Sequence, residues 1–314
     1  MLNVRRFVQG TDEPIWVEIL NASFRGRDDW KTITAERMLR EEKERPGFDV
    51  EGRFIAELDL KPAGAVHAHV DRRMDETKGI IRFHVIPEWR GKGVEHKLLE
   101  TAIGELKARG LTAAQTSVDS GDLDYVEILR NLGFRQMRVG SNMEMELAHI
   151  PHGVGENSEV AIRFLRKDKE QDIELCTRLS NETFKEHFNF RPDTVEEIRY
   201  FLFSDLYFNK YKQIFFAILD NEAVGYIGVG IDGRHNLERK LKAGEIFTIG
   251  VLKKHRRQGV GARLMLHALT VLESEGMTNA RLGVDDYNPT NAMRLYEKVG
   301  FKVTKKDLFF EREL

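Results

Sequence analysis

Apolar and polar residues alternate along the second half of the chain in a pattern that predicts several strands. The segments 213–219, 223–231 and 245–251 are rich in Ile, Val and Phe, as is typical of strands. Apolar residues then recur at every second position of 280–284, which indicates a half-buried strand. The tail, 301–314, supplies further closing strands.

Apolar residues at helical spacing predict helices between these strands. They cover 173–188, with a candidate break at 180–181, then 196–203, and a stretch that begins near Val260. Asn288 and Pro289 stand at the N-cap and first-turn positions expected of a last helix, which Gly300 would end.

A weak internal repeat indicates that one fold is used twice. The stretch PEWRGKGVEHKLL begins at Pro87, and KKHRRQGVGARLM begins at Lys253, 166 positions later. We therefore expect an N-terminal domain over 1–147, a linker rich in Gly and polar residues over 148–158, and a second domain over 159–314. Each domain is expected to be an α/β (α+β) fold, a mixed, mainly antiparallel sheet flanked by helices.

Composition excludes several classes of protein. The 314 residues carry a formal net charge of −2, so no global field attracts nucleic acid or an anionic membrane. A single cysteine, Cys176, rules out an intramolecular disulfide framework and is expected to be buried filler. With no metal-ligand spacing, signal peptide or membrane-spanning run in the sequence, we expect a cytoplasmic protein without a metal.

The segment between the strand 245–251 and the next helix is a candidate anion site. Glycines there allow backbone N–H groups to close on phosphate oxygens, and the helix N-terminus favours an anion. The alternative is a tight turn with a solvated basic rim. The candidate phosphate-binding residues are Arg256, Arg257, Gln258, Gly259, Val260 and Gly261.

Together with a second motif, this loop resembles the Gcn5-related N-acetyltransferase (GNAT) superfamily. The motifs are Arg256-x-x-Gly259-x-Gly261 after a strand, and Asn288-x-x-Asn291-Ala292-x-x-x-Tyr296-x-x-x-Gly300-Phe301. The tandem layout is most similar to the mycothiol synthase family. The resemblance implies tandem GNAT domains that use acetyl-CoA as co-substrate.

The resemblance also implies roles for particular residues. An amine would attack the thioester directly in a ternary complex, with Glu245 as general base and Tyr296 as proton donor to the leaving thiolate. A β-bulge in the strand 245–251 would direct an N–H group at the developing oxyanion. The alternatives are a solvated strand-end carboxylate for Glu245 and an ordinary half-buried aromatic for Tyr296. Further acetyl-CoA contacts would come from Ile249, Gly250, Val251, Asn288 and Asn291.

The first copy departs from this pattern. Glu95 stands where the second copy has Gly261, and a carboxylate there opposes a pyrophosphate. In the sequence alignment Gly79 falls on Glu245, Leu129 on Tyr296 and Gly121 on Asn288. We therefore expect the first copy to be non-catalytic, with retained CoA binding as the rival interpretation.

The resemblance favours a small-molecule primary amine as acceptor. The alternatives are acetylation of a protein N-terminus or lysine, and a regulatory module that binds acyl-CoA without turnover. We expect a monomer or homodimer.

Overall fold

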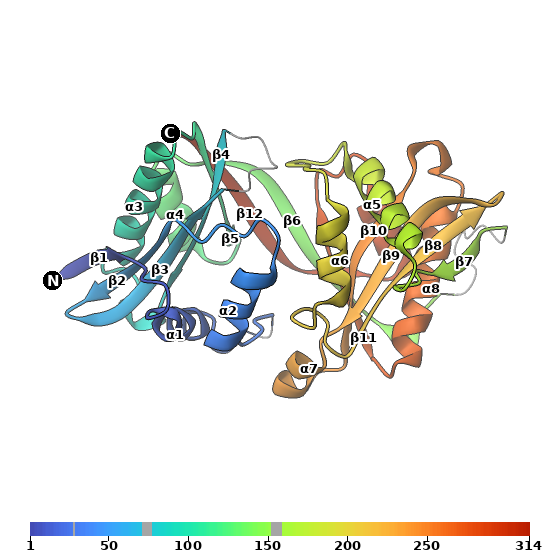
Figure 1. The fold of residues 1–314 in the computed structure, drawn as a ribbon, viewed down its shortest axis with the longest axis horizontal. Helices are drawn as coiled ribbons and strands as arrows, with labels where there is room; N and C mark the ends of the chain where they lie inside the picture. The colour runs from blue at the N-terminus through green and yellow to red at the C-terminus, as the bar shows by residue number, and fades with distance from the viewer. Residues whose placement is uncertain (28, 71–76, 152–158) are drawn as a thin grey trace. The chain divides into compact units, whose positions relative to one another are not determined.

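The computed structural model describes residues 1–27, 29–70, 77–151 and 159–314 (Figure 1). The chain divides into two compact units. Unit 1 comprises Met1–Arg138 and Asp307–Leu314, and unit 2 comprises Val139–Lys306. Residues 152–158, most of the predicted linker, lie outside the described residues.

The elements of the two halves of the sequence follow the same order, apart from one added helix. In the first half they are β1 (Leu2–Arg6), α1 (Glu13–Ser23), α2 (Ala35–Glu44), β2 (Arg53–Leu58), β3 (Lys61–His69), β4 (Lys78–Val85), α3 (Val94–Ala108), β5 (Ala113–Asp119), α4 (Leu123–Asn131) and β6 (Arg135–Glu146). In the second half they are β7 (Ala161–Phe164), α5 (Glu170–Phe184), α6 (Val195–Phe203), β8 (Tyr211–Leu219), β9 (Glu222–Ile231), α7 (Gly233–Arg239), β10 (Ala243–Val251), α8 (Val260–Ser274), β11 (Asn279–Asp285), α9 (Ala292–Val299) and β12 (Lys302–Glu313). The mixed, mainly antiparallel sheet with flanking helices is thus confirmed.

The units exchange their last strands. In unit 1 the strand order is β1-β2-β3-β4-β5-β12, and Asp307–Glu313 of β12 run antiparallel to β5. In unit 2 the order is β6-β11-β10-β9-β8-β7, and Gly140–Glu146 of β6 run antiparallel to β11. Each sheet is therefore completed by a strand from the other half of the sequence, which the repeat did not indicate.

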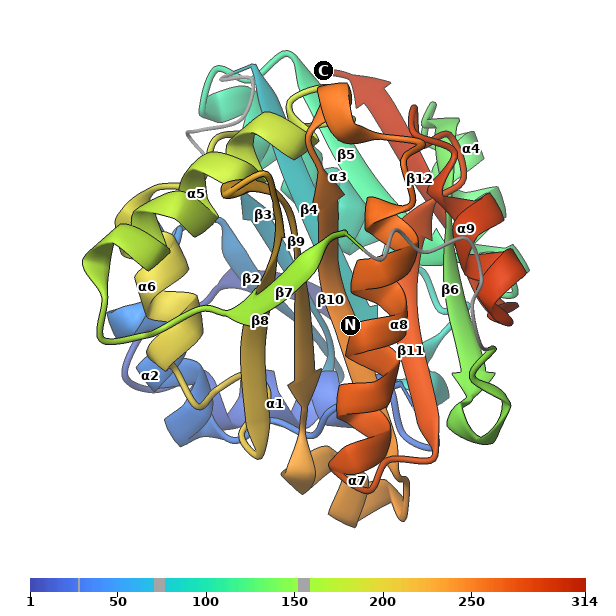
Figure 2. The same cartoon turned by 90° about the vertical axis from the view of Figure 1, so that its right-hand side faces the viewer.

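In unit 2 the two faces of the sheet carry different cores. On one face α8 packs along β9 and β10 (Figure 2). On the other face α5 and α6 cover a smaller apolar cluster that includes Phe216 and Tyr226. The buried side chains of α8 are Val260, Ala262, Leu264, Met265, Leu266, Ala268, Leu269 and Leu272.

Two local predictions about unit 2 need correction, and one helix was not predicted. The candidate break at 180–181 does not interrupt α5, because the side chains of Ser180 and Asn181 bond to Asp193 and leave the helix intact. The polar stretch 232–243 contains α7, capped where Asp232 Oδ1 accepts a hydrogen bond from the His235 N–H at 3.1 Å. The tail forms a single strand, β12.

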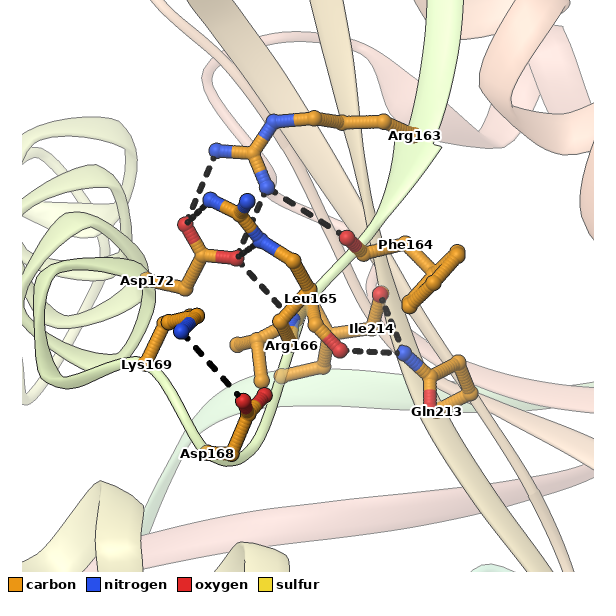
Figure 3. A network of polar contacts seen from close by, with 9 residues as sticks. All are labelled: Arg163, Phe164, Leu165, Arg166, Asp168, Lys169, Asp172, Gln213 and Ile214. Atoms are coloured by element: carbon orange, nitrogen blue, oxygen red, sulfur yellow. Dashed lines mark hydrogen bonds and ion pairs between the residues drawn. The ribbon is translucent and has the colours of Figure 1, made fainter.

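A buried carboxylate fixes the start of α5 to the strand before it (Figure 3). Asp172 accepts hydrogen bonds from the Arg163 guanidinium at 2.9 and 3.0 Å and from the Arg166 guanidinium at 2.9 and 3.1 Å. These two arginines, Arg166 first, hold the pKa of Asp172 well below its usual range. In unit 1 Asp12 makes the equivalent contact and accepts hydrogen bonds from the Arg5 guanidinium at 2.6 and 3.0 Å.

Candidate active site

The loop before α8 has the backbone of an anion-binding nest. Arg257 and Gly259 both adopt left-handed conformations, with φ of 64° and 78°. Such a conformation turns successive N–H groups toward one point. Gly259 is the N-cap of α8, and the first turn has no side-chain cap and no acidic residue. The N–H groups at this end of α8 therefore suit an external anion.

The Arg256 side chain connects this loop to β10 and α5. Its Nε donates to the Val251 carbonyl at 3.0 Å, and Nη2 donates to the Thr183 carbonyl at 3.4 Å. In unit 1, Arg90 makes the same two bonds, to Val85 at 3.2 Å and to Ser23 at 3.0 Å. The shared arginine therefore joins strand, loop and helix in both units.

The corresponding loop of unit 1 already contains an anion. Glu95, in the first turn of α3, is only 2% exposed. Its Oε1 accepts a hydrogen bond from the Gly91 N–H at 3.1 Å. Gly91 and Gly93 repeat the left-handed pair of Arg257 and Gly259. The backbone of the nest is thus retained, while one of its donors is occupied by the protein's own carboxylate.

In unit 2, β10 separates from β11 along part of its length and contains a β-bulge. Its parallel pairing with β11 covers only Ala243 to Ile246, although both strands continue, so the sheet opens between them. The register with β9 shifts between Ile246 and Thr248, which places a β-bulge at Phe247. The expected bulge is therefore present. In unit 1, β4 separates from β5 after Ile80 but pairs with β3 without a register shift.

Gly250 lies where the end of β10 contacts α5 and β9. A Cβ atom added there would be 2.4 Å from Thr183 Oγ1 and 2.8 Å from Tyr226 Cε1, so only glycine fits. Arg90 bonds to the Val85 carbonyl as Arg256 bonds to the Val251 carbonyl, so Val85 matches Val251. The residue before each valine is matched too, and His84 of unit 1 therefore corresponds to Gly250. Its imidazole packs against Phe24, with ring centroids 5.1 Å apart.

Glu245 lies at the start of β10, opposite Gly230 of β9 and Arg281 of β11. The bulge corrects its alignment with unit 1. Gly79 pairs with Ala114 as Gly244 pairs with Ala280, and a Cβ at either glycine would strike a leucine of the following helix. Gly79 therefore matches Gly244, and Ile80 takes the place of Glu245. The inserted residue in β10 produced the one-residue error.

Tyr296 on α9 is 5% exposed and packs against Phe301. Burial raises the pKa of its phenol to about 12, so the group keeps its proton at physiological pH. The neighbouring Leu295 lies against the start of α8, since a Cβ at Gly261 would be 3.3 Å from Leu295 Cδ2. Leu129 occupies the matching position in unit 1, because the Phe134 N–H bonds to it as the Phe301 N–H bonds to Tyr296.

The start of α9 differs from the prediction. The helix begins at Ala292 with Asn291 as its N-cap, so Asn288 and Pro289 precede it. Asn288 Oδ1 instead accepts from the Thr290 N–H at 2.8 Å and hydroxyl at 2.6 Å, which forms a local turn. Asn291 has a φ of 55° and no side-chain cap bond. Both asparagines shape the loop beside Tyr296.

Sequence reasoning missed a group of hydroxyls beside the bulge. Thr248 Oγ1 donates to Tyr226 Oη at 3.1 Å. Tyr226 is 2% exposed, and burial raises the pKa of its phenol well above the ordinary value. The only signal in the sequence was a polar Thr248 within the apolar run of β10.

A family model described as the acetyltransferase (GNAT) family matches residues 14–134 and 174–301. The chain belongs to this family. It is an acyltransferase, and the two matched regions fall one in each half of the tandem.

Curated relatives and solved structures agree with this assignment. A mycothiol acetyltransferase of Acidothermus cellulolyticus is 27% identical over 81% of this chain and 77% of its own length. A mycothiol acetyltransferase of Streptomyces avermitilis is 31% identical over 42% of each chain. A GCN5-related N-acetyltransferase of Sphaerobacter thermophilus (TM-score 0.72, 19% identity) covers 99% of this chain and 95% of its own. A tandem GNAT protein of the clavulanic acid pathway (TM-score 0.73, 14% identity) covers 100% and 98%. Both solved structures share the fold.

Other candidate chemistry finds no support among the described residues. Cys176 is buried, and burial raises the pKa of its thiol to about 12. These properties suit a residue that packs in the core rather than a nucleophile. The described parts of the chain contain no group of three or more His, Cys, Asp or Glu that could hold a metal ion. No helix within them is long and apolar enough to cross a membrane.

Proposed function

We propose that unit 2 transfers an acetyl group from acetyl-CoA to the primary amine of a small molecule, and that unit 1 is non-catalytic. The observation that carries this proposal is the contrast between the two nests. The first turn of α8 has no acidic residue, whereas Glu95 bonds into the nest of α3. Only unit 2 offers a pyrophosphate a complete set of backbone donors.

In this proposal the thioester lies along the opened edge of β10. Backbone groups of Ile249, Gly250 and Val251 are free of β11 there and suit the pantetheine arm. The bulge at Phe247 rotates the local backbone, so that an N–H group can stabilise the oxyanion as the amine attacks. Arg257, Gln258 and the N–H groups of Gly259, Val260 and Gly261 would hold the pyrophosphate, with Asn288 and Asn291 beside it.

Two residues would handle protons. Glu245 takes one proton from the incoming ammonium, directly or through a water, to give the nucleophilic amine. Tyr296, with its proton retained up to a pH of about 12, donates to the departing CoA thiolate. The amine binds on the face covered by α5 and α6, where Phe247 packs against Phe201 and Phe208 with centroids 5.0 and 5.2 Å away.

The mycothiol acetyltransferase relatives support a small-molecule acceptor. The test is incubation with acetyl-CoA and a panel of small amines and short peptides, following release of free CoA. We expect turnover with small amines, and a fall in kcat of about 100-fold in Tyr296→Phe and Glu245→Gln. Tyr211→Phe removes a hydroxyl from β8, two strands away from β10, and serves as the matched control.

Tight binding of acetyl-CoA without turnover on any amine would favour a regulatory module instead. Turnover confined to peptides would move the acceptor to proteins. An unchanged kcat in Tyr296→Phe would remove that residue from the mechanism.

A further inference from the structure

A line of hydroxyl groups leads from the bulge of β10 to the surface of unit 2. Thr248 Oγ1 donates to Tyr226 Oη at 3.1 Å. Burial raises the pKa of the Tyr226 phenol, and the Ser180 hydroxyl lies close enough to lower it in part. Ser180 Oγ in turn donates to Asp193 Oδ2 at 2.8 Å. The Asp193 side chain is 31% exposed and lies 3.7 Å from Arg191 Nη1, so the line ends at solvent.

The inner end of this line lies at the predicted reaction centre. Thr248 is the first residue after the bulge at Phe247, and its side chain points to the α5/α6 face because it bonds to Tyr226. Ile249 and Val251, by contrast, pack with the core on the α8 face. An amine that attacks a thioester held on β10 from the α5/α6 face would therefore approach the Thr248 hydroxyl.

Unit 1 shows that the fold does not require these hydroxyls. The backbone contact between α5 and the segment before α6 is kept in both units. Asn181 Nδ2 donates to the Asp193 carbonyl at 3.0 Å, and Asn21 Nδ2 donates to the Ile33 carbonyl at 2.9 Å. The contact therefore fixes the equivalence of the two helices, with matched residues 160 positions apart.

With this equivalence, every member of the line is lost from unit 1 together. Ile33 replaces Asp193, and Leu20 replaces Ser180. Ala65 pairs with His84 as Tyr226 pairs with Gly250, so alanine replaces the tyrosine. Thr248 lies two positions before Gly250, and Arg82, two positions before His84, takes its place in unit 1. Residues that only stabilised the fold would not be expected to disappear as a set from the unit that also lost the open nest.

We propose that this line is a proton relay, which carries the second amine proton away from the reaction centre. The proposal rests on the proposed function of unit 2. Its members, from the reaction centre outward, are Thr248, Tyr226, Ser180 and Asp193.

The proton balance assigns the relay a distinct step. An incoming ammonium loses one proton to Glu245 before attack. After the new C–N bond forms, the nitrogen passes its second proton to Thr248 Oγ1, which gives its own to Tyr226, and so on to the Asp193 carboxylate and solvent. The C–S bond breaks, and Tyr296 protonates the thiolate and is reprotonated from solvent. Two protons leave the nitrogen and one goes to CoA, so the reaction releases one proton.

The experiment uses the full chain, saturating acetyl-CoA and an amine found in the panel, with single-turnover rates in H2O and D2O. Thr248→Val keeps the shape of the side chain and removes the hydroxyl, while Thr248→Ser does the reverse. We expect Thr248→Val and Tyr226→Phe to slow acetyl transfer about 10- to 100-fold and to change the solvent isotope effect. Thr248→Ser should stay within about threefold of the parent chain, and the control Tyr211→Phe should match it.

A rate and isotope effect that survive both Thr248→Val and Tyr226→Phe would overturn the relay but leave the proposed function standing. A loss in Thr248→Ser as large as in Thr248→Val would also overturn it, because packing rather than the hydroxyl would then be responsible. If the parent chain acetylates no amine at all, the proposed function fails and the relay fails with it.

Discussion

The two units keep the same structural contacts and differ in the groups that could do chemistry. Asp12 and Asp172 each join a strand to the next helix, and Arg90 and Arg256 make the same two bonds to backbone carbonyls. At the nest, however, unit 1 has Glu95 at the position that Gly261 occupies in unit 2. Residues kept in both units hold the fold together, whereas residues present in unit 2 alone are the candidates for the reaction.

In the phosphate loop of unit 2, Arg256 makes backbone contacts that Arg90 also makes in unit 1. Arg256 donates through its guanidinium to the Val251 and Thr183 carbonyls and to Glu186 Oε2 at 3.2 Å. Arg90 donates to the two matching carbonyls in a loop that contains a carboxylate. The distinguishing feature is the side chain at the start of the helix. Unit 1 carries a carboxylate there, and Glu95 Oε1 accepts a hydrogen bond from the Gly91 N–H.

The largest effect on acetyl-CoA binding is expected from a substitution that gives unit 2 the loop carboxylate of unit 1. Gly261→Glu should place a carboxylate on the loop N–H groups, where it competes with and repels the pyrophosphate. We expect acetyl-CoA affinity to fall about 1000-fold, or about 4 kcal/mol, measured by calorimetric titration. Gly104→Glu adds the same charge at an open position of α3 and should bind normally. If Gly261→Glu bound acetyl-CoA within threefold of the parent, a carboxylate at this position would not be what separates the two units.

A smaller effect tests the contact that both units share. Asp172→Ala leaves two arginines without their buried partner. Because these arginines are 36% and 50% exposed and regain water, the free energy of unfolding should fall by about 2 kcal/mol. Asp12→Ala should act similarly in unit 1. Asp168→Ala, at a carboxylate that is 75% exposed, is the control. Denaturant melts of the full chain that show no difference between Asp172→Ala and Asp168→Ala would contradict the assignment.

The same residue gives a pH dependence of defined sign. The pKa of Asp172 is lowered in the folded state, so its contribution is present above the unfolded pKa near 4 and is lost as the pH falls through the folded value. Unfolding free energies of the parent and Asp172→Asn should therefore converge in acid.

The smallest expected effect concerns Arg257, which replaces a left-handed glycine of unit 1. Its φ of 64° is costly for a side-chain-bearing residue, so Arg257→Gly should relieve strain and stabilise the chain by about 0.5–1 kcal/mol. Acetyl-CoA should bind about tenfold more weakly, because one cation is lost. Unchanged affinity would show that backbone donors alone hold the phosphates.

The fold and the family were accessible from the sequence because they depend on local signals. The loop motif and the apolar periodicity of β8 to β11 identify the elements within a few residues. The exchange of β6 and β12 was not accessible, since both copies present equivalent last strands and the pattern does not state which sheet each one joins.

The site was accessible in part. The loop from Arg256 to Gly261 and Tyr296 were named from motifs, and the structure places them between β10 and α8 and on α9. Their roles in binding and catalysis stay predictions. The hydroxyl line was not accessible, because Thr248, Tyr226 and Ser180 come from three elements and meet only after folding. The bulge at Phe247 also displaced the alignment of β4 by one residue, an error that only backbone pairing could correct.

The central claim is that unit 2 alone retains an acetyl-CoA site. Calorimetric titration of the full chain with CoA measures it directly, as the number of sites per chain. We predict one equivalent, abolished by Gly261→Glu. Two equivalents per chain, or one equivalent that survives Gly261→Glu, would contradict the account.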